Sequence, residues 1–240
     1  MIYDIAGLRI SIENRCKYTE HFCKGYLSED QSSPVDLHTK VTDEEFYAEK
    51  NFSPNFPDGY IENICLYRGI CRQLPVLNRL LLHSAVLSIH GEGYAFLGRS
   101  GTGKSTHTGL WIKHLKDVHI VNGDKPILEY KDGAFIAYGT PWNGKEGLGE
   151  NTSAQLKGLC FLEQAKENSI NRLSPSEASA RVLGQILFPS DEANAGKTLE
   201  LADKLITETP CWLLRCDISE TAVKTSFEAM TGKEYEQAKK

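Results

Sequence analysis

The sequence lacks any long apolar run, any basic stripe and any paired cysteine motif. No stretch approaches the roughly 18 consecutive apolar residues of a membrane span, so none is expected. Lysine and arginine are dispersed in a chain of net charge −5, and the longest basic cluster is Lys239-Lys240. Because a nucleic-acid-binding protein would carry a concentrated basic patch, nucleic acid is not an expected partner.

Cysteine is present but follows no metal-binding or redox pattern. The seven residues contain no Cys-x-x-Cys pair and no zinc spacing: Cys16, Cys23, Cys65, Cys71, Cys160, Cys211 and Cys216. Residues 1–11 mix Asp4 and Arg9 into their apolar residues and lack the core of a signal peptide. These features favour a cytoplasmic protein whose cysteines are free thiols.

The chain does have enough apolar residues for one large domain with a small appendage. Of its 240 residues, 40% are hydrophobic and 25% are charged. We expect residues 1–75 to form a small N-terminal β-rich region. Residues 8–12 alternate as a half-exposed strand does, residues 13–60 are polar with only short strands or loops expected, and residues 61–74 are amphipathic.

Residues 76–240 are predicted to form an α/β domain with a hairpin-rich sheet and flanking helices. Two hairpins are expected, one turning at residues 90–93 and one at Lys131-Asp132-Gly133. Ser174 and Glu177 have the spacing of a capping box, with a proline at the first helical position between them. Further strands are expected at residues 118–121, 156–163 and 211–216, and helices at residues 106–115, 176–187, 192–207 and after residue 219.

Residues 98–105 match the phosphate-loop pattern G-x-x-x-x-G-K-[ST]. A short apolar run precedes the loop and a helical pattern follows it, as such a loop requires. Backbone N–H groups of a loop of this kind form a concave anion site, and the following helix points its positive end at the same place. The alternative is a glycine-rich turn before a surface helix. The residues predicted to bind phosphate are Gly98, Ser100, Gly101, Thr102, Gly103, Lys104, Ser105 and Thr106.

The pattern implies ATP and Mg²⁺ as cofactors. Lys104 is expected to reach the β and γ phosphates, and the Ser105 hydroxyl to bind Mg²⁺. A second metal ligand should end a buried strand after the loop helix, and Asp124 stands there. The alternative for Asp124 is an ordinary Asn-Gly-Asp turn.

Several segments resemble one family of kinases. Residues 96–106 look like the loop shared by HPr kinase/phosphorylase and phosphoenolpyruvate carboxykinase. His83 resembles the histidine that lies near the phosphates in HPr kinases, and residues 121–124 resemble their strand ending in an Asp-Asp pair. Asp124 falls on the metal-binding member of that pair, whereas Gly123 replaces the member that accepts the proton. Residues 145–149 are similar to a later segment with an Arg-Gly-Leu-Gly core.

The resemblance covers about residues 80–190. It implies a phosphoenolpyruvate-carboxykinase-like fold and an ATP-dependent kinase of the HPr kinase type. The implied acceptor is a hydroxyl, a serine of a peptide or protein. A homo-oligomer is compatible with the sequence, although no residue indicates one. Two other functions stay open: an ATP-binding regulator without phosphotransfer, favoured by Gly123, and a small-metabolite kinase.

The candidate catalytic residues are Asp124, His83, Lys104 and Lys145. Asp124 or His83 is expected to take the proton from the acceptor, although His83 could also be a core histidine. Lys145 could offset developing charge on the γ-phosphate, or could be a solvated loop lysine. Trp142 in the same loop is expected to pin that loop to the core, although it could also stack on adenine or on a peptide.

Overall fold

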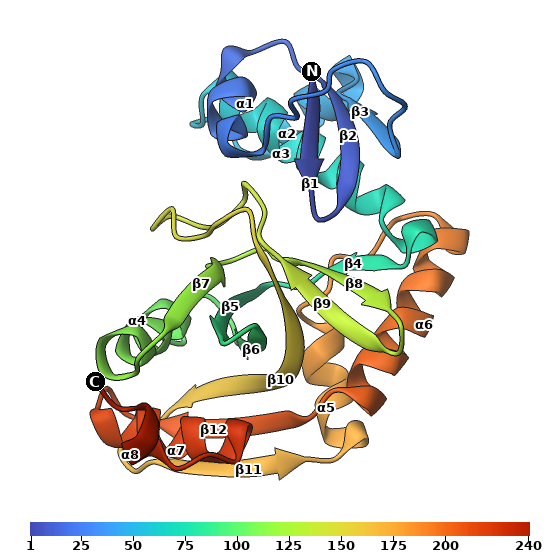
Figure 1. Ribbon diagram of the computed structural model, residues 1–240. Helices are drawn as coiled ribbons and strands as arrows, with labels where there is room; N and C mark the ends of the chain where they lie inside the picture. The colour runs from blue at the N-terminus through green and yellow to red at the C-terminus, as the bar shows by residue number, and fades with distance from the viewer.

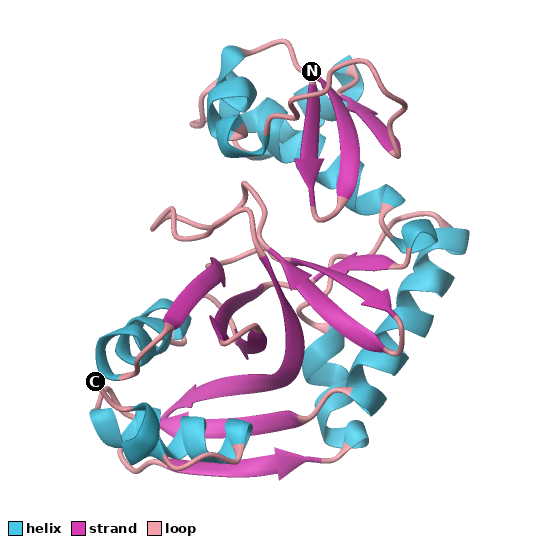
Figure 2. Ribbon diagram, in the orientation of Figure 1, coloured by secondary structure: helices cyan, strands magenta, loops and turns pink.

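The computed structural model describes all residues 1–240 as an N-terminal lobe next to a larger mixed α/β unit with a curled sheet and flanking helices (Figure 1; Figure 2). In the lobe the elements are β1 (Ile2–Ile5), β2 (Leu8–Glu13), α1 (Lys17–Phe22), β3 (Leu37–Lys40), α2 (Asp43–Phe52) and α3 (Asp58–Gln73). No helix combines the length and apolarity that a membrane crossing requires.

The larger unit begins with short strand β4 and ends with helix α8. Its elements are β4 (Arg79–Leu81), β5 (Ser84–Ile89), β6 (Glu92–Leu97), α4 (Lys104–His114), β7 (Val118–Asn122), β8 (Ile127–Lys131), β9 (Ala134–Tyr138), β10 (Ser153–Gln164), β11 (Ser169–Leu173), α5 (Pro175–Leu183), α6 (Glu192–Glu208), β12 (Cys211–Cys216), α7 (Glu220–Thr231) and α8 (Tyr235–Ala238). Both predicted hairpins, β5–β6 and β8–β9, are confirmed. The predicted capping box of Ser174 and Glu177 is also confirmed at the start of α5.

The N-terminal lobe is more helical than the sequence indicated. The prediction of a β-rich region is wrong here, because α1, α2 and α3 occupy more of it than the three short strands do. The predicted strand at residues 8–12 is confirmed as β2, whose Leu8, Ile10 and Ile12 are buried. The division of the chain at residue 75 stays a prediction.

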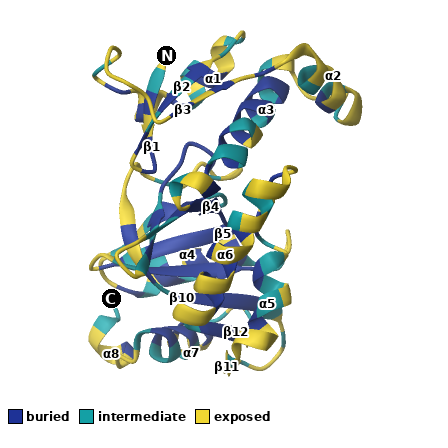
Figure 3. Cartoon of the chain, turned by 90° about the vertical axis from the view of Figure 1, so that its right-hand side faces the viewer, coloured by how far each residue is buried: buried dark blue, intermediate teal, exposed yellow.

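The large sheet has the strand order β4-β8-β9-β10-β6-β5-β7, and β12 pairs with both β10 and β11. Strand β10 carries apolar residues toward both faces: Leu159 and Phe161 pack with α5 and α6, whereas Cys160 and Leu162 pack with α4 and α7. Strands covered on both faces are apolar in succession. Figure 3 shows this pattern, with buried strands beneath helices whose outer faces are exposed.

The two parts of the molecule share a hydrophobic cluster. Leu81, Ile127 and Trp142 of the larger unit join the core of the N-terminal lobe. Trp142 lies 6.4 Å from Phe22 and 5.1 Å from Tyr67 between ring centroids, and is buried. The expectation that Trp142 pins its loop to the core is therefore confirmed, and the lobe lies against the loop that follows β9 (Figure 1).

Candidate functional site

The phosphate-loop pattern lies between a buried strand and a helix, as the motif requires. Buried β6 ends at Leu97 and α4 begins at Lys104. Gly101 and Gly103 have φ of 83° and 103°, which side chains disfavour. The backbone N–H groups of residues 99–101 and 103–106 make no hydrogen bond within the protein. Unpaired N–H groups at a helix start form an anion site in combination with the helix dipole.

Helix α4 is held in place by hydrogen bonds to helix α7. Ser226 of α7 accepts a hydrogen bond from Trp111 Nε1 at 2.9 Å and lies 3.0 Å from His107 Nε2. His107 is buried, and burial lowers its pKa to about 4, so it packs as a neutral side chain. The start of α4 is thus anchored to the core.

Lys104 has its ammonium group at the loop. Its Nζ donates to the carbonyl of Gly98 at 2.7 Å, so the side chain folds back across the loop. Burial lowers the pKa of Lys104, while the negative charge of Asp124 partly opposes that shift. The structure therefore brings two predicted site residues, separated by twenty positions, within electrostatic reach of each other.

The sheet topology explains why these residues meet. Strand β5 is antiparallel to both β6 and β7, so the C-terminal ends of β6 and β7 lie at the same edge as the start of β5. Ser84 pairs with Leu97, and Val86 pairs with Asn122. His83, just before β5, therefore lies between the phosphate loop and the turn that carries Asp124.

Asp124 is the centre of a charged cluster. Its Oδ1 lies 3.0 Å from His83 Nε2, and its Oδ2 accepts from Lys125 Nζ at 2.8 Å. Burial raises the pKa of Asp124, but the hydrogen bonds from His83 and Lys125 outweigh burial and lower the pKa to about 2. Asp124 is therefore a carboxylate at neutral pH.

The turn that carries Asp124 is fixed by a buried asparagine. Asn122 Oδ1 accepts from the backbone N–H groups of Asp124 at 2.9 Å and Lys125 at 2.7 Å. Its Nδ2 donates to the carbonyl and the hydroxyl of Thr140, each at 3.1 Å. Asn122 is fully buried, so these contacts hold the turn rigidly to the loop after β9.

Gly123 has no space for a side chain. A Cβ at this position would lie 2.8 Å from the carbonyl oxygen of Asn143 and 3.0 Å from that of Leu148. The N–H of Gly123 donates to Leu148 at 2.9 Å. The loop after β9 therefore leaves no room for a side chain at position 123.

The remaining predicted residues lie at the rim of the site. Ser100, Ser105 and Thr106 are exposed around the start of α4, while the Thr102 hydroxyl donates to the carbonyl of Arg99 at 2.9 Å. Lys145 is exposed in the turn next to Asp124 and contacts no acidic side chain. The metal and phosphate roles of these residues stay predictions.

Two residues at the site escaped sequence reasoning. Lys125 directly follows Asp124, so the sequence places it near the site, but no sequence feature distinguishes it from an ordinary surface lysine. Tyr67 of α3 lies under Lys125, with Nζ 5.7 Å from the ring centroid. No local signal places Tyr67 there, because the contact depends on how the N-terminal lobe packs.

Comparisons with known proteins add a distant structural likeness. No family model matches the chain, and no curated protein matches it in sequence. Among solved structures, the fold is similar to that of the HPr(Ser) kinase/phosphatase from Coxiella burnetii, with 13% sequence identity and a TM-score of 0.34. The match covers 62% of this chain and 97% of that chain. A likeness this distant leaves the functional assignment to the residues of the site.

Proposed function

We propose that this protein is an ATP- and Mg²⁺-dependent phosphotransferase acting on a hydroxyl, a serine of a peptide or protein. The observation that carries the proposal is the row of unpaired backbone N–H groups before and within the first turn of α4, at the same sheet edge as the His83–Asp124–Lys125 cluster. An anion site next to a fixed carboxylate is the arrangement that nucleotide-dependent phosphoryl transfer uses.

The residues present fit ATP and Mg²⁺. The loop N–H groups, Lys104 and Thr106 would hold the phosphates, since they offer unpaired donors and a positive charge. Ser105 and Asp124 would hold Mg²⁺, which prefers hard oxygen ligands and completes its shell with phosphate oxygens and water. No group of three His, Cys, Asp or Glu side chains forms a separate metal site. When bound, Mg-ATP supplies the phosphoryl group.

His83 is the better candidate for the proton acceptor. Asp124 is a poor base because its pKa is lowered to about 2. Its carboxylate, 3.0 Å from His83 Nε2, would orient the imidazole and stabilise the charged form that proton uptake creates. In this assignment the acceptor oxygen bonds to the γ-phosphorus, the bond to the β-phosphate oxygen breaks, and the hydroxyl proton passes to His83. Lys145 would then face the developing negative charge.

One observation favours a second function. The loop after β9 fills the space beside Gly123, so no acid can stand in the position that the resemblance assigns to the base. A nucleotide-binding regulator has no need of that acid. In such a protein ATP would bind at α4 without transfer of its γ-phosphate.

Transfer of radiolabel from γ-labelled ATP to serine-containing peptides tests the proposal. We expect Mg²⁺-dependent labelling that the Lys104→Ala substitution reduces by about 10²-fold or more, because a cation at the phosphates is lost. Lys113→Ala, at an exposed position of the same helix, is the matched control and should retain activity. ATP binding without labelling of any peptide or small hydroxyl compound would select the regulator, whereas labelling of small compounds alone would indicate a metabolite kinase.

A further inference from the structure

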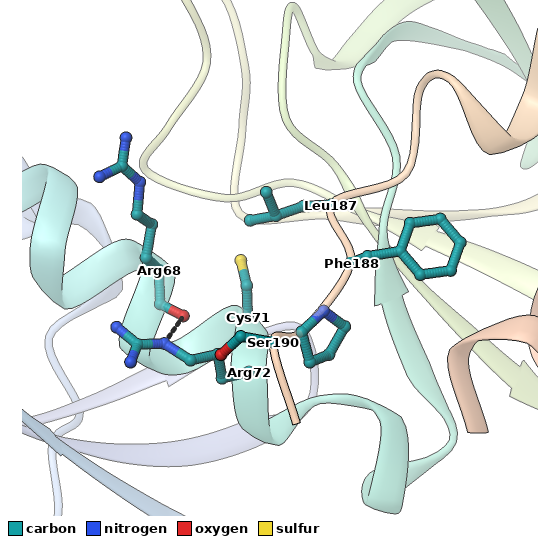
Figure 4. Close-up of a pocket in the computed structure, with 7 residues that line it drawn as sticks. Arg68, Cys71, Arg72, Leu187, Phe188 and Ser190 are labelled. Carbon is teal, nitrogen blue, oxygen red and sulfur yellow. Dashed lines mark hydrogen bonds between the residues drawn. The ribbon is translucent and has the colours of Figure 1, made fainter. Parts of the chain in front are cut away.

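A cavity of about 150 Å³ lies between helix α3 of the N-terminal lobe and the segment 187–190 that joins α5 to α6 (Figure 4). Arg68, Cys71 and Arg72 line it from α3, and Leu187 faces them from the opposite wall. Burial raises the pKa of the Cys71 thiol to about 12, so this residue serves as an unreactive floor.

One wall of this cavity is connected to His83. The segment before α6 runs beside the strand that leads into β5: the N–H of His83 donates to the carbonyl of Gln185 at 2.8 Å. Two residues further on, the N–H of Leu187 donates to the carbonyl of Leu81 at 3.4 Å. Leu187 therefore lies two residues along the chain from Gln185, whose carbonyl accepts the hydrogen bond from the backbone of His83, the proposed base.

The other wall is connected to Asp124. Cys71 lies one helical turn after Tyr67, and the two side chains are neighbours. Tyr67 in turn lies under Lys125, whose Nζ donates to Asp124. Both walls of the cavity are thus connected through neighbouring residues to the His83–Asp124 pair, one through Leu81 and Gln185 and the other through Tyr67 and Lys125.

Two of the residues that line the cavity are arginines, whose guanidinium groups lie on the side away from segment 187–190 and have donors to spare (Figure 4). Arg68 pairs with Glu49 and Arg72 with Glu45, the latter at 2.7 Å, so both are oriented by helix α2. Their side chains remain 46% and 42% exposed. Because a guanidinium has five N–H donors in a planar fork, each can bind a further carboxylate while keeping its partner.

The size of the cavity limits what can enter. Small-molecule sites usually exceed about 300 Å³, so this one suits a single side chain of a larger substrate. Leu187 and Phe188 add exposed apolar surface at its edge. We infer that this cavity is the acceptor subsite and binds an acidic residue, with an adjoining apolar residue, near the serine of a peptide substrate. This inference rests on the proposed function and names the class of its acceptor.

Binding of an array of synthetic serine peptides, in pairs that differ by Asp or Glu against Asn or Gln, tests the inference. Fluorescence anisotropy with ADP and Mg²⁺ present measures affinity without requiring transfer. Acidic members should bind about tenfold more tightly than their amide counterparts. The double variant Arg68→Gln, Arg72→Gln should abolish this difference and leave nucleotide affinity unchanged. Arg172→Gln, in exposed β11, is the matched control.

A second variant keeps the test independent of the arginine ion pairs. Leu187→Asp places a negative charge on the partly exposed opposite wall and should weaken acidic peptides selectively. Equal binding of acidic and amide peptides, a preference that survives in both variants, or no binding by any peptide would overturn the inference. Acid-dependent binding without phosphate transfer would leave the subsite standing and contradict the proposed function. Phosphate transfer without a preference for acidic peptides would support the proposed function and contradict the subsite.

Discussion

Two glycine-rich loops meet around Asp124 and use glycine in opposite ways. In the phosphate loop, residues 98–103, the N–H groups are largely unpaired, and a Cβ added at Gly101 or Gly103 would meet no atom within 4 Å. In the loop of residues 139–152, the N–H groups of Gly139, Asn143, Gly147, Glu150 and Thr152 donate to backbone carbonyls, and a Cβ added at Gly139 would strike the backbone of Glu150 and Val121. The first loop is open for a ligand and the second is closed by packing.

This difference separates a binding motif from a structural one that looks similar in sequence. Glycine in the open loop permits positive φ, and the N–H groups of that loop stay unpaired within the protein. Glycine in the closed loop permits close approach of two backbones, as at Gly139, and Gly123 permits the same approach from the turn that faces this loop. Sequence shows the glycines in both cases, but only the structure shows whether their N–H groups are already satisfied.

The largest expected effect comes from filling a glycine of the closed loop. A Cβ at Gly139 would lie 1.7 Å from the carbonyl oxygen of Glu150 and 2.7 Å from that of Val121. We expect Gly139→Ala to lower the free energy of unfolding by about 4 kcal/mol or more, since the clash is with backbone. Urea unfolding measures this change.

Gly101→Ala is the matched control in the open loop. It meets no neighbouring atom, and only its φ of 83° opposes a side chain, so about 1–2 kcal/mol is expected. Equal losses of stability in the two variants would contradict the distinction between the loops.

A smaller effect concerns Asp124, which lies between the loops. The pKa of Asp124 is lowered to about 2 from 3.8, so the folded state holds the proton less tightly than the unfolded state. Its contribution to stability is present above about pH 4 and is lost as pH falls toward 2. Asp124→Asn should therefore cost roughly 2 kcal/mol at pH 7 and progressively less below pH 4.

Urea unfolding of the wild type and of Asp124→Asn at several pH values measures this dependence. Asp203→Asn, at an exposed position of α6 without an ion pair, provides the control. A stability difference that stays constant from pH 7 to pH 3 would show that the His83 and Lys125 contacts do not hold the carboxylate in its charged form.

Local signals account for the parts of the fold that were predictable. The β8–β9 hairpin follows from Asp132-Gly133, whose φ values are both positive, and β2 follows from alternation that the structure buries. Strand β11 was missed because its residues are mostly exposed and carry no alternation. Helix α2 was missed although Thr42 and Glu45 form a capping box, since the polar stretch around them hides any apolar period.

The candidate site likewise contains residues that local motifs predict and residues that only tertiary packing brings together. Lys104, His83 and Asp124 stand in motifs that a strand and a loop define locally, and the sheet brings them to one edge. Tyr67 and Arg68 belong to a helix of the N-terminal lobe, and the positions of Tyr67 beside Lys125 and of Arg68 at the cavity depend on packing between the two parts of the molecule. That packing rests on many dispersed apolar contacts, which leave no compact pattern in the sequence.

The smallest expected effect tests whether the closed loop also takes part in chemistry. Lys145 is exposed in that loop and contacts no acidic side chain, so Lys145→Ala should change stability by less than about 0.5 kcal/mol. An exposed charge about 4 Å from a developing negative charge contributes about 1 kcal/mol, so transfer should slow about fivefold. Peptide phosphorylation rates measure this, with Lys145→Arg expected to restore the rate and Lys131→Ala, at the exposed end of β8, to leave it unchanged. If the phosphorylation rate does not depend on the charge at position 145, the loop of residues 139–152 serves packing alone. Of the two glycine-rich loops, only the phosphate loop would then take part in the proposed transfer.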